Sequence, residues 1–204
     1  MPAGGYPVVL DVTDRPCLVV GGGPVAARKA QSLLDCGADV TVVAPEVDPA
    51  IEALGVTVER RPYEPGMAGR FRLVVTATGR TEVDGAVAEE ADRAGVWVNS
   101  ADDPDHCTFI LPSVHRDGPV TVAVSTGGAS PALAVWLRRR LGAEAGEGVG
   151  QLADLLAEAR HRMRTEGRST ESVDWAALLD GDLPGLVAHG DLDAARDLID
   201  RAVG

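Results

Sequence analysis

The chain has 204 residues, of which 45% are hydrophobic and 25% are charged, the composition of a globular protein that can bury a core. Its net charge of −12 argues against nucleic acids and anionic membranes as partners, because Coulomb repulsion opposes both. It has no apolar run near the roughly 18–20 residues of a membrane span, no signal-peptide pattern and only three, widely spaced cysteines, which together predict a cytoplasmic protein.

Apolar strands alternate with helical segments through the first half of the chain. The strands are expected at 16–20, 40–44, 56–58, 73–77 and 96–98. One helix begins at Pro24 and ends before Gly37, and a second covers residues 82–94. Uniformly apolar strands separated by helices predict a mainly parallel sheet covered on both faces, a doubly wound α/β fold of the Rossmann type.

The pattern changes after the fifth strand. Two extended segments, 108–111 and 120–124, flank a turn at Asp117-Gly118. Ser130-Pro131 then begins a helix that runs to about Leu141, with serine as the N-cap and proline at the first helical position.

The last third of the chain is mostly helical. The glycine-rich stretch 142–150 predicts a break and a hinge. An amphipathic helix at 151–166 and short helices near 172–179 and 192–202 follow, and together they predict a small helical module.

The first strand runs directly into the pattern Gly21-x-Gly23-x-x-Ala26, which opens the first helix. This is the dinucleotide-binding fingerprint with alanine at its third position. Gly21 allows the tight turn, Gly23 leaves room for a pyrophosphate, and Ala26 lets the helix pack closely on the strand. The phosphates would meet free N–H groups and the positive end of the helix dipole. The other interpretation is a glycine-rich turn without a ligand.

Glu46 follows the second strand, where this fingerprint expects an acidic residue for the ribose hydroxyls. No arginine neighbours it in the sequence, which favours NAD over NADP as the cofactor. The alternative is a solvated loop acid, and the residue types alone do not separate the two.

Several segments, in this order and spacing, resemble the precorrin-2 dehydrogenase family, the dehydrogenase and ferrochelatase part of siroheme synthases. They are YPVVLDV, CLVVGGGPVAARKAQSLLDCGADVTVVAPE, LVVTATG, WVNSADDP, TFILPSV and VTVAVSTGGASPALAVWLRRRL. The likeness runs from about residue 6 to the end of the chain. GGGPVAARK alone indicates only a dinucleotide, whereas NSADDP and STGGASP at these distances are much more specific.

The resemblance implies an enzyme that oxidises precorrin-2 to sirohydrochlorin and passes a hydride to NAD⁺. Some family members also insert Fe²⁺ to make siroheme, a lyase activity. The implied organisation is a Rossmann domain at 1–112, a small α+β dimerisation region at 113–144 and a helical C-terminal domain at 145–204. The family forms homodimers through the central region.

The resemblance also implies cofactor-binding residues that agree with the fingerprint. The pyrophosphate would lie against the glycine turn, the adenosine ribose near the end of the second strand, and the rest of the cofactor at the ends of the fourth and fifth strands. These residues are Gly21, Gly22, Gly23, Pro24, Val25, Pro45, Glu46, Thr76, Ala77, Thr78 and Asn99.

The family's catalytic aspartate, in the pattern Asn-x-x-Asp, matches Asp102. Dehydrogenation removes a hydride and a proton, and metal insertion strips protons from pyrrole nitrogens, so both steps need a general base beside the nicotinamide. Asp102 follows the fifth strand and so lies at the carboxyl edge of the sheet, where ligands bind. The alternative is a plain acidic turn around Pro104. His106 is either a transient Fe²⁺ ligand or a structural side chain, and no resident metal site is recognisable.

A second segment is expected to bind the carboxylates of the substrate. Ser125, Thr126 and Gly127 stand where the family often has Ser-Ser-Gly, and threonine keeps the hydroxyl. Arg116 and the arginine run 138–140 are candidate partners for the same carboxylates. A solvated helix end is an equal alternative for the run.

Two other functions compete with the dehydrogenase. A non-catalytic NAD-sensing regulatory module would need no base beside the nicotinamide, so NSADDP argues against it. A dimeric scaffold with a degenerate nucleotide site is disfavoured by the intact Gly21, Gly23 and Ala26.

Overall fold

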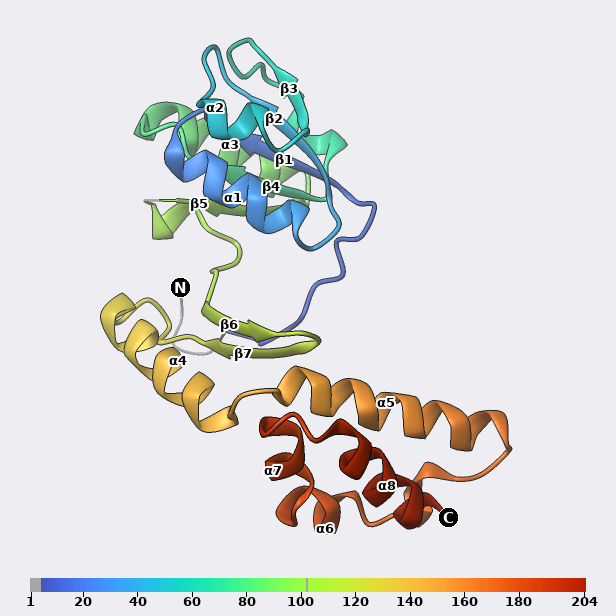
Figure 1. Ribbon diagram of the computed structural model, residues 1–204. Helices are drawn as coiled ribbons and strands as arrows, with labels where there is room; N and C mark the ends of the chain where they lie inside the picture. Colours follow the sequence, from blue (N-terminus) through green and yellow to red (C-terminus); the bar gives the residue numbers. More distant parts are fainter. Residues whose placement is uncertain (1–4, 102) are drawn as a thin grey trace. The chain divides into compact units, whose positions relative to one another are not determined.

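The computed structural model describes residues 5–101 and 103–204 (Figure 1). The chain divides into two compact units at residues 111 and 112, and each is described by itself. The predicted three-part division at 112 and 144 remains a prediction. Within the described ranges, no helix combines the length and apolarity that crossing a bilayer requires.

The first unit is built on a five-stranded sheet in which every neighbouring pair is parallel. Its strands are β1 (Pro16–Val20), β2 (Asp39–Val43), β3 (Thr57–Glu59), β4 (Leu73–Thr76) and β5 (Trp97–Ser100). They lie in the order β3-β2-β1-β4-β5, so the chain reverses direction across the sheet between β1 and β4. This confirms the predicted Rossmann-type fold, in which ligands bind at that switch point.

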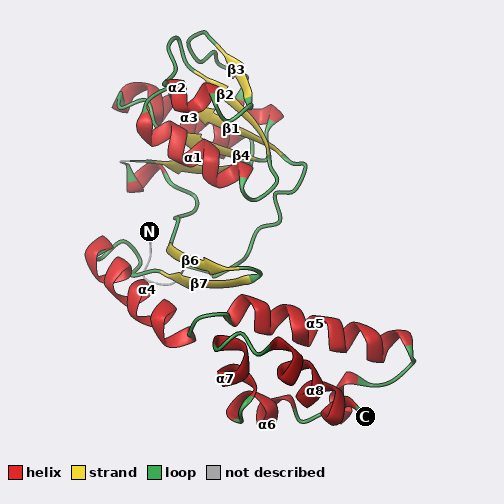
Figure 2. Cartoon of the chain, in the orientation of Figure 1, coloured by secondary structure: helices red, strands yellow, loops and turns green. Residues whose placement is uncertain are grey.

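Helices cover both faces of this sheet (Figure 2). They are α1 (Pro24–Leu34), α2 (Pro49–Glu52) and α3 (Thr81–Arg93), with single 3-10 turns η1 (Ala68–Arg70) and η2 (Pro104–His106). Along β1, Leu18 packs in the cluster that holds Val87 of α3, and Val19 packs in the cluster that holds Ala30 of α1. The alternation of side chains along a strand therefore builds two buried layers from one apolar run.

The second unit contains a hairpin and five α-helices among its described residues. The antiparallel hairpin is β6 (Ser113–Asp117) and β7 (Val120–Val124). The helices are α4 (Pro131–Ala145), α5 (Val149–Thr165), α6 (Trp175–Asp180), α7 (Leu183–Ala188) and α8 (Leu192–Val203), with a 3-10 turn η3 (Thr170–Ser172) before α6. Leu152, Met163, Leu183 and Ile199 lie in one core that joins α5 to α7 and α8, which confirms the predicted helical module.

The strand expected at 108–111 is wrong, because β6 begins only at Ser113. Thr108 instead forms hydrogen bonds with the backbone N–H and C=O groups of a single residue of the edge strand β5. Its N–H and hydroxyl donate to the carbonyl oxygen of Val98 at 2.9 and 3.3 Å, and its hydroxyl oxygen accepts the Val98 N–H at 2.8 Å. The segment is therefore anchored by Thr108 and its neighbour rather than extended along a ladder.

The break expected at 142–150 is confirmed but is shorter than predicted, and a hinge there stays a prediction. α4 continues to Ala145 and α5 begins at Val149, so only residues 146–148 connect the two helices. Gly142, inside α4, lies against the imidazole of His115 on β6, and a Cβ there would come within 2.9 Å of the ring. This glycine permits close packing of the helix on the hairpin.

Gly150 serves the same purpose at the start of α5. Its N–H donates to the carboxylate of Asp117 at 3.1 Å, and a Cβ would lie 2.6 Å from the Asp117 carbonyl oxygen. Asp117 ends β6, so the first turn of α5 is held directly on the hairpin. The glycines therefore tighten a junction that the sequence pattern alone presents as loose.

We predict that Gly150→Ala destabilises the protein by about 1–3 kcal/mol, because the added methyl must displace backbone in a packed contact. The measurement is the midpoint of thermal unfolding followed by circular dichroism. Gly185→Ala in α7 is the matched control, since a Cβ there meets nothing within 4 Å and alanine favours a helix. Equal midpoints for the two variants would contradict the packing role of Gly150.

Candidate functional site

The turn after β1 is held by two close backbone approaches. Gly21 has φ +131°, and a Cβ there would lie 2.3 Å from the carbonyl oxygen of Ala77, which follows β4. A Cβ on Gly22 would lie 1.8 Å from the carbonyl oxygen of Glu46, which follows β2. Both glycines are therefore required by the protein itself, since any side chain would push the loops after β2 and β4 away from the turn.

Gly23 differs from its two neighbours, because a Cβ there meets nothing within 4 Å. It is the N-cap of α1 and supplies no side-chain cap, and Pro24 follows at the first helical position. The first-turn N–H groups of a helix have no partner within the helix, and the helix dipole makes this end positive. The space beside Gly23 therefore fits a phosphate group, as the fingerprint predicts.

A cavity of about 600 Å³ lies beside this turn. Six predicted cofactor residues line it: Gly21, Gly22, Gly23, Pro45, Glu46 and Thr78. Among the other lining residues are Asp48, Tyr63 and Arg80, which the sequence reasoning did not single out. Arg80 stands four residues after β4, and a basic residue in the loop next to the glycine turn is the signal that could have found it.

The other predicted cofactor residues lie around the turn or at the strand ends without lining this cavity. Pro24 and Val25 form the first turn of α1, and Ala77 continues β4 toward Gly21. The Thr76 side chain is fully buried, and its hydroxyl donates to the hydroxyl oxygen of Ser100 on β5 at 3.0 Å.

Asn99 on β5 is only 6% exposed, and its amide is engaged within the protein. The side-chain N–H₂ donates to the carbonyl oxygen of Phe109 at 3.1 Å, and the side-chain oxygen accepts from the ammonium of Lys29 on α1 at 3.3 Å. This amide therefore ties α1 and the segment after η2 to the carboxyl end of β5.

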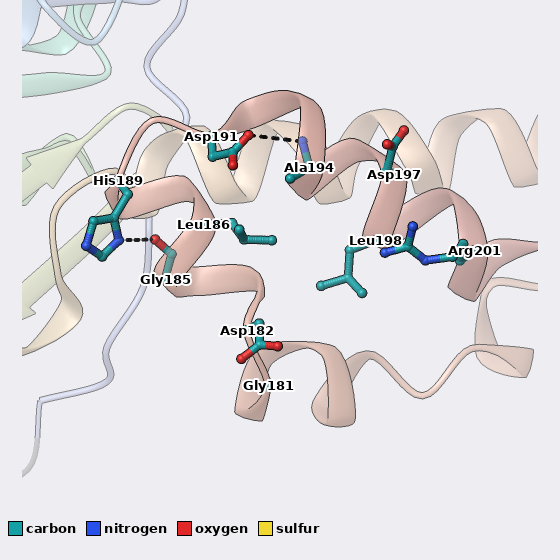
Figure 3. A pocket seen from close by; sticks show the side chains of 10 residues that line it. All are labelled: Gly181, Asp182, Gly185, Leu186, His189, Asp191, Ala194, Asp197, Leu198 and Arg201. Atoms are coloured by element: carbon teal, nitrogen blue, oxygen red, sulfur yellow. Dashed lines mark hydrogen bonds between the residues drawn. The ribbon is translucent and has the colours of Figure 1, made fainter.

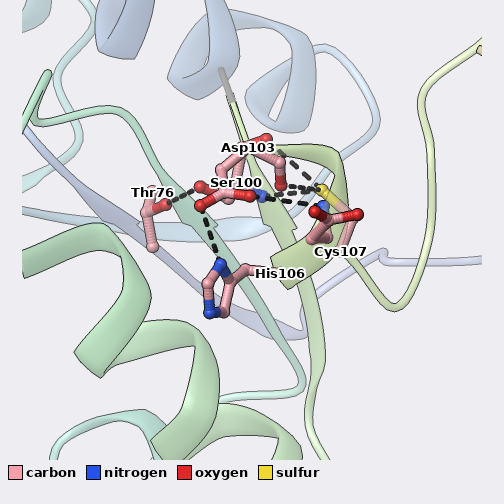
Figure 4. Close-up of polar contacts among 6 residues, drawn as sticks. Thr76, Ser100, Asp103, His106 and Cys107 are labelled. Carbon is pink, nitrogen blue, oxygen red and sulfur yellow. Dashed lines mark hydrogen bonds and ion pairs between the residues drawn. The ribbon is translucent and has the colours of Figure 1, made fainter. Parts of the chain in front are cut away.

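Asp102, the predicted catalytic carboxylate, lies outside the described residues. The residues on both sides of it are held by one thiol (Figure 4). The carbonyl oxygens of Ser100 and Asp103 share the one S–H hydrogen of Cys107, each at 3.3 Å from the sulfur, and the sulfur accepts the Ser100 N–H at 3.2 Å. Burial raises the pKa of this thiol, so it acts here as a neutral anchor.

Asp103 and His106 form a hydrogen-bonded pair next to this anchor, with His106 Nδ1 2.7 Å from Asp103 Oδ2, and the pair is ionic when the imidazole is protonated. The hydrogen bond and charge of Asp103 raise the pKa of the imidazole, and the imidazolium lowers the pKa of the carboxyl. The ring also lies beside Gly85 of α3, where a Cβ would be 3.7 Å away. His106 is thus a structural partner of Asp103.

The predicted substrate segment, in the second unit, is a turn between β7 and α4. The hydroxyl of Thr126 donates to the carbonyl oxygen of Ser130 and accepts its N–H, both at 3.1 Å. Ser125 Oγ accepts the N–H of Gly127 at 3.2 Å and keeps its own hydrogen for another acceptor. Arg116 lies on the exposed face of β6.

A second cavity lies between α7 and α8 and contains none of the predicted residues (Figure 3). Two of its polar side chains form hydrogen bonds within the helices themselves. Asp191 caps α8 by accepting the Ala194 N–H at 3.3 Å, and His189 Nδ1 lies 2.7 Å from the Gly185 carbonyl oxygen.

Comparison with known proteins supports dinucleotide binding at the glycine turn. A family model described as putative NAD(P)-binding matches residues 8–113. The chain belongs to this NAD(P)-binding family. A second model, described as sirohaem biosynthesis protein central, matches residues 117–144. These matches confirm the prediction of a nicotinamide dinucleotide as the cofactor.

Individual relatives extend the likeness to nearly the whole chain. A siroheme synthase of Methylococcus capsulatus is 41% identical over 96% of this chain, and siroheme synthase 1 of Aeromonas salmonicida is 39% identical over 95%. The chain spans only 43% of the length of each. The solved structure described as SirC, precorrin-2 dehydrogenase, is 27% identical with a TM-score of 0.74, covering 97% of this chain and 98% of its own. The resemblance to the precorrin-2 dehydrogenase family is thereby confirmed.

We predict that Gly22→Ala destabilises the first unit by about 2 kcal/mol or more, because its methyl would overlap the Glu46 carbonyl oxygen. Gly23→Ala should cost no more than about 1 kcal/mol, because its methyl enters open space and the change loses only the preference of the N-cap position for glycine over alanine. Urea unfolding followed by circular dichroism measures both. Equal losses of stability would mean that the two glycines do not divide their roles in this way.

Proposed function

We propose that the chain is an NAD-dependent precorrin-2 dehydrogenase that forms sirohydrochlorin for siroheme biosynthesis. The observation that carries this proposal is the end-to-end likeness to the SirC precorrin-2 dehydrogenase, which leaves almost no part of either chain unmatched. The siroheme synthase relatives support the same pathway. The glycine turn and its cavity supply a place for the dinucleotide.

Two carboxylates favour NAD over NADP at this cavity. Glu46 and Asp48 both line it, after β2. A carboxylate accepts hydrogen bonds from the ribose hydroxyls, whereas it repels a 2′-phosphate. The ribose of the adenosine is therefore proposed to lie at this end of the cavity.

NAD⁺ held at the glycine turn would supply the hydride acceptor for precorrin-2, and the Asp102 carboxylate is proposed to accept the proton that leaves the substrate with the hydride. A carboxylate is suited to this step when it is held close to the proton that it removes. The Cys107 thiol holds Ser100 and Asp103, and Asn99 is fixed by Lys29 and Phe109. These bonds support the proposal because they hold Asn99, Ser100 and Asp103, which lie on either side of Asp102 in the sequence.

The carboxylates of the substrate are proposed to bind at Ser125, Thr126, Gly127 and Arg116. Ser125 is the better hydroxyl donor of the pair, because the Thr126 hydroxyl already donates within the turn. Arg116 supplies a positive charge on the hairpin. Iron insertion belongs to the proposal as a second step, in which the same Asp102 carboxylate takes protons that Fe²⁺ displaces from pyrrole nitrogens.

A homodimer is proposed through the second unit. A two-stranded sheet is marginal on its own, yet β6 and β7 form one, with Val114 on its more exposed face. On α4, the side chains of Leu133 and Trp136 are 46% and 54% exposed. Exposed apolar side chains on the hairpin and on α4 support burial against a second copy.

We predict that Asp102→Asn binds NAD⁺ normally but slows precorrin-2 oxidation by about 10²–10⁴-fold, because the amide cannot accept the proton. The assay mixes protein, precorrin-2 and NAD⁺ without oxygen, follows the visible spectrum, and then adds Fe²⁺ to test insertion. Normal turnover by this variant would overturn the role of Asp102. Binding of NAD⁺ without any turnover by the unaltered protein would favour the NAD-sensing module.

We predict that Trp136→Glu raises the dimer dissociation constant by on the order of tenfold or more, because a buried apolar anchor is replaced by a charge. Sedimentation velocity over a concentration series measures the change. Leu179→Glu is the control. It places the same charge at an apolar side chain that is 41% exposed, but on α6, which is not part of the proposed interface. A monomer at all concentrations in the unaltered protein would refute the dimer.

A further inference from the structure

We infer that Arg80 binds the pyrophosphate of the dinucleotide. This inference rests on the proposed function and adds to it a residue that neither the fingerprint nor the resemblance assigns. It follows from where Arg80 stands, how its backbone is held, and which charges surround the cavity.

The position of Arg80 follows from the strand order. β4 is the neighbour of β1 on the side where the chain reverses direction, so the loop after β4 lies beside the glycine turn. The carbonyl oxygen of Ala77 in this loop would be 2.3 Å from a Cβ on Gly21, which shows how closely the two segments approach. Arg80 lines the same cavity as Gly23. It is thus on the side of the turn where the phosphates would lie.

The backbone around Arg80 is fixed by a buried carboxylate. Asp84 of α3 is only 8% exposed, and it accepts the Thr78 N–H at 3.2 Å and the Thr78 hydroxyl at 2.8 Å. The oxygen of that hydroxyl accepts the Arg80 N–H at 3.1 Å. Arg80 therefore starts from a held position, which lowers the entropy lost when its side chain binds an anion.

The charges around the cavity favour an anion at Arg80. Two nearby arginines are already paired, Arg60 with Glu52 and Arg61 with Glu59 and Glu64. None of the ion pairs formed by the described residues includes Arg80.

Of the described residues that line the cavity, Arg80 is the basic one, and Glu46 and Asp48 are acidic. A protein with a net charge of −12 needs a local cation to hold the two negative phosphates of a dinucleotide. A guanidinium suits this task because it can donate two parallel hydrogen bonds to phosphate oxygens.

Two other roles for Arg80 make different predictions. A guanidinium that recognised a 2′-phosphate would favour NADP, but Glu46 and Asp48 in the same cavity would repel that group. A guanidinium stacked on adenine would contribute equally to ligands with and without phosphates. Ligands that carry only part of the dinucleotide separate these roles.

The test uses the full chain and isothermal titration calorimetry with NAD⁺, NADP⁺, ADP and adenosine. Arg80→Gln is expected to weaken NAD⁺ and ADP by about 10-fold or more, because it removes hydrogen bonds to a charged group, and to leave adenosine unchanged. Arg80→Lys should recover part of the affinity, because it keeps the charge but loses the fork geometry.

Arg72→Gln is the matched control. Arg72 is exposed and directly precedes β4, at the amino end of the strand and therefore at the opposite edge of the sheet from the cavity. The Arg72→Gln substitution removes the same charge as Arg80→Gln and should leave the affinity for every ligand unchanged. Equal weakening by Arg72→Gln and Arg80→Gln would reduce the effect to overall charge and overturn the inference.

The remaining outcomes are also decisive. Unchanged NAD⁺ and ADP affinity in Arg80→Gln would overturn the inference and leave the proposed function standing. If Arg80→Gln weakened adenosine as much as NAD⁺, Arg80 would stack on adenine instead of binding the pyrophosphate. If it weakened only NADP⁺, Arg80 would recognise a 2′-phosphate instead. Failure of the unaltered protein to bind NAD⁺ would instead refute the proposed function itself.

Discussion

The rest of the first unit depends on one constraint, the approach of two loops to a turn that has no side chains. The carbonyl oxygens of Ala77 and Glu46 occupy the space that Cβ atoms on Gly21 and Gly22 would need. Because these oxygens follow β4 and β2, the contact gathers the carboxyl ends of three neighbouring strands around one point. Gly23 then leaves open space at the start of α1. The same compact turn therefore both closes the sheet edge and creates the cavity beside it.

The segment around Asp102 illustrates how polar groups shape the other side of this edge. Hydrogen bonds from Cys107 and Thr108 satisfy the edge backbone groups of Ser100 and Val98, in place of the ladder that a sixth strand would have supplied. Buried polar groups need partners, so these bonds satisfy the backbone at the end of β5. Apolar packing thus holds the strand β5, and polar side-chain hydrogen bonds hold its carboxyl end. The sheet holds β5, and the side chains hold the segment after it.

The two units use glycine for the same physical purpose. In the first unit, Gly21 and Gly22 admit carbonyl oxygens, and in the second unit Gly142 and Gly150 admit a ring and a carbonyl oxygen. Glycine-rich sequence is often interpreted as flexibility, yet here most of these positions lie where a methyl would collide. The difference matters for function, because a held α4 and α5 keep the hairpin and the helical module together.

The sequence alone determined the parallel sheet, the fingerprint and the helical module, because strand composition, glycine spacing and helical periodicity are local properties. The order and spacing of the quoted sequence segments were also enough to identify the family. Only the tertiary structure decided that 108–111 is not a strand and that the break within 142–150 is confined to residues 146–148, since both depend on contacts with distant residues. It also decided that Gly22 is required by Glu46 and that Arg80 shares a cavity with Gly23. Such pairings arise when separate strands end at one edge, and no local pattern encodes which side chains then meet.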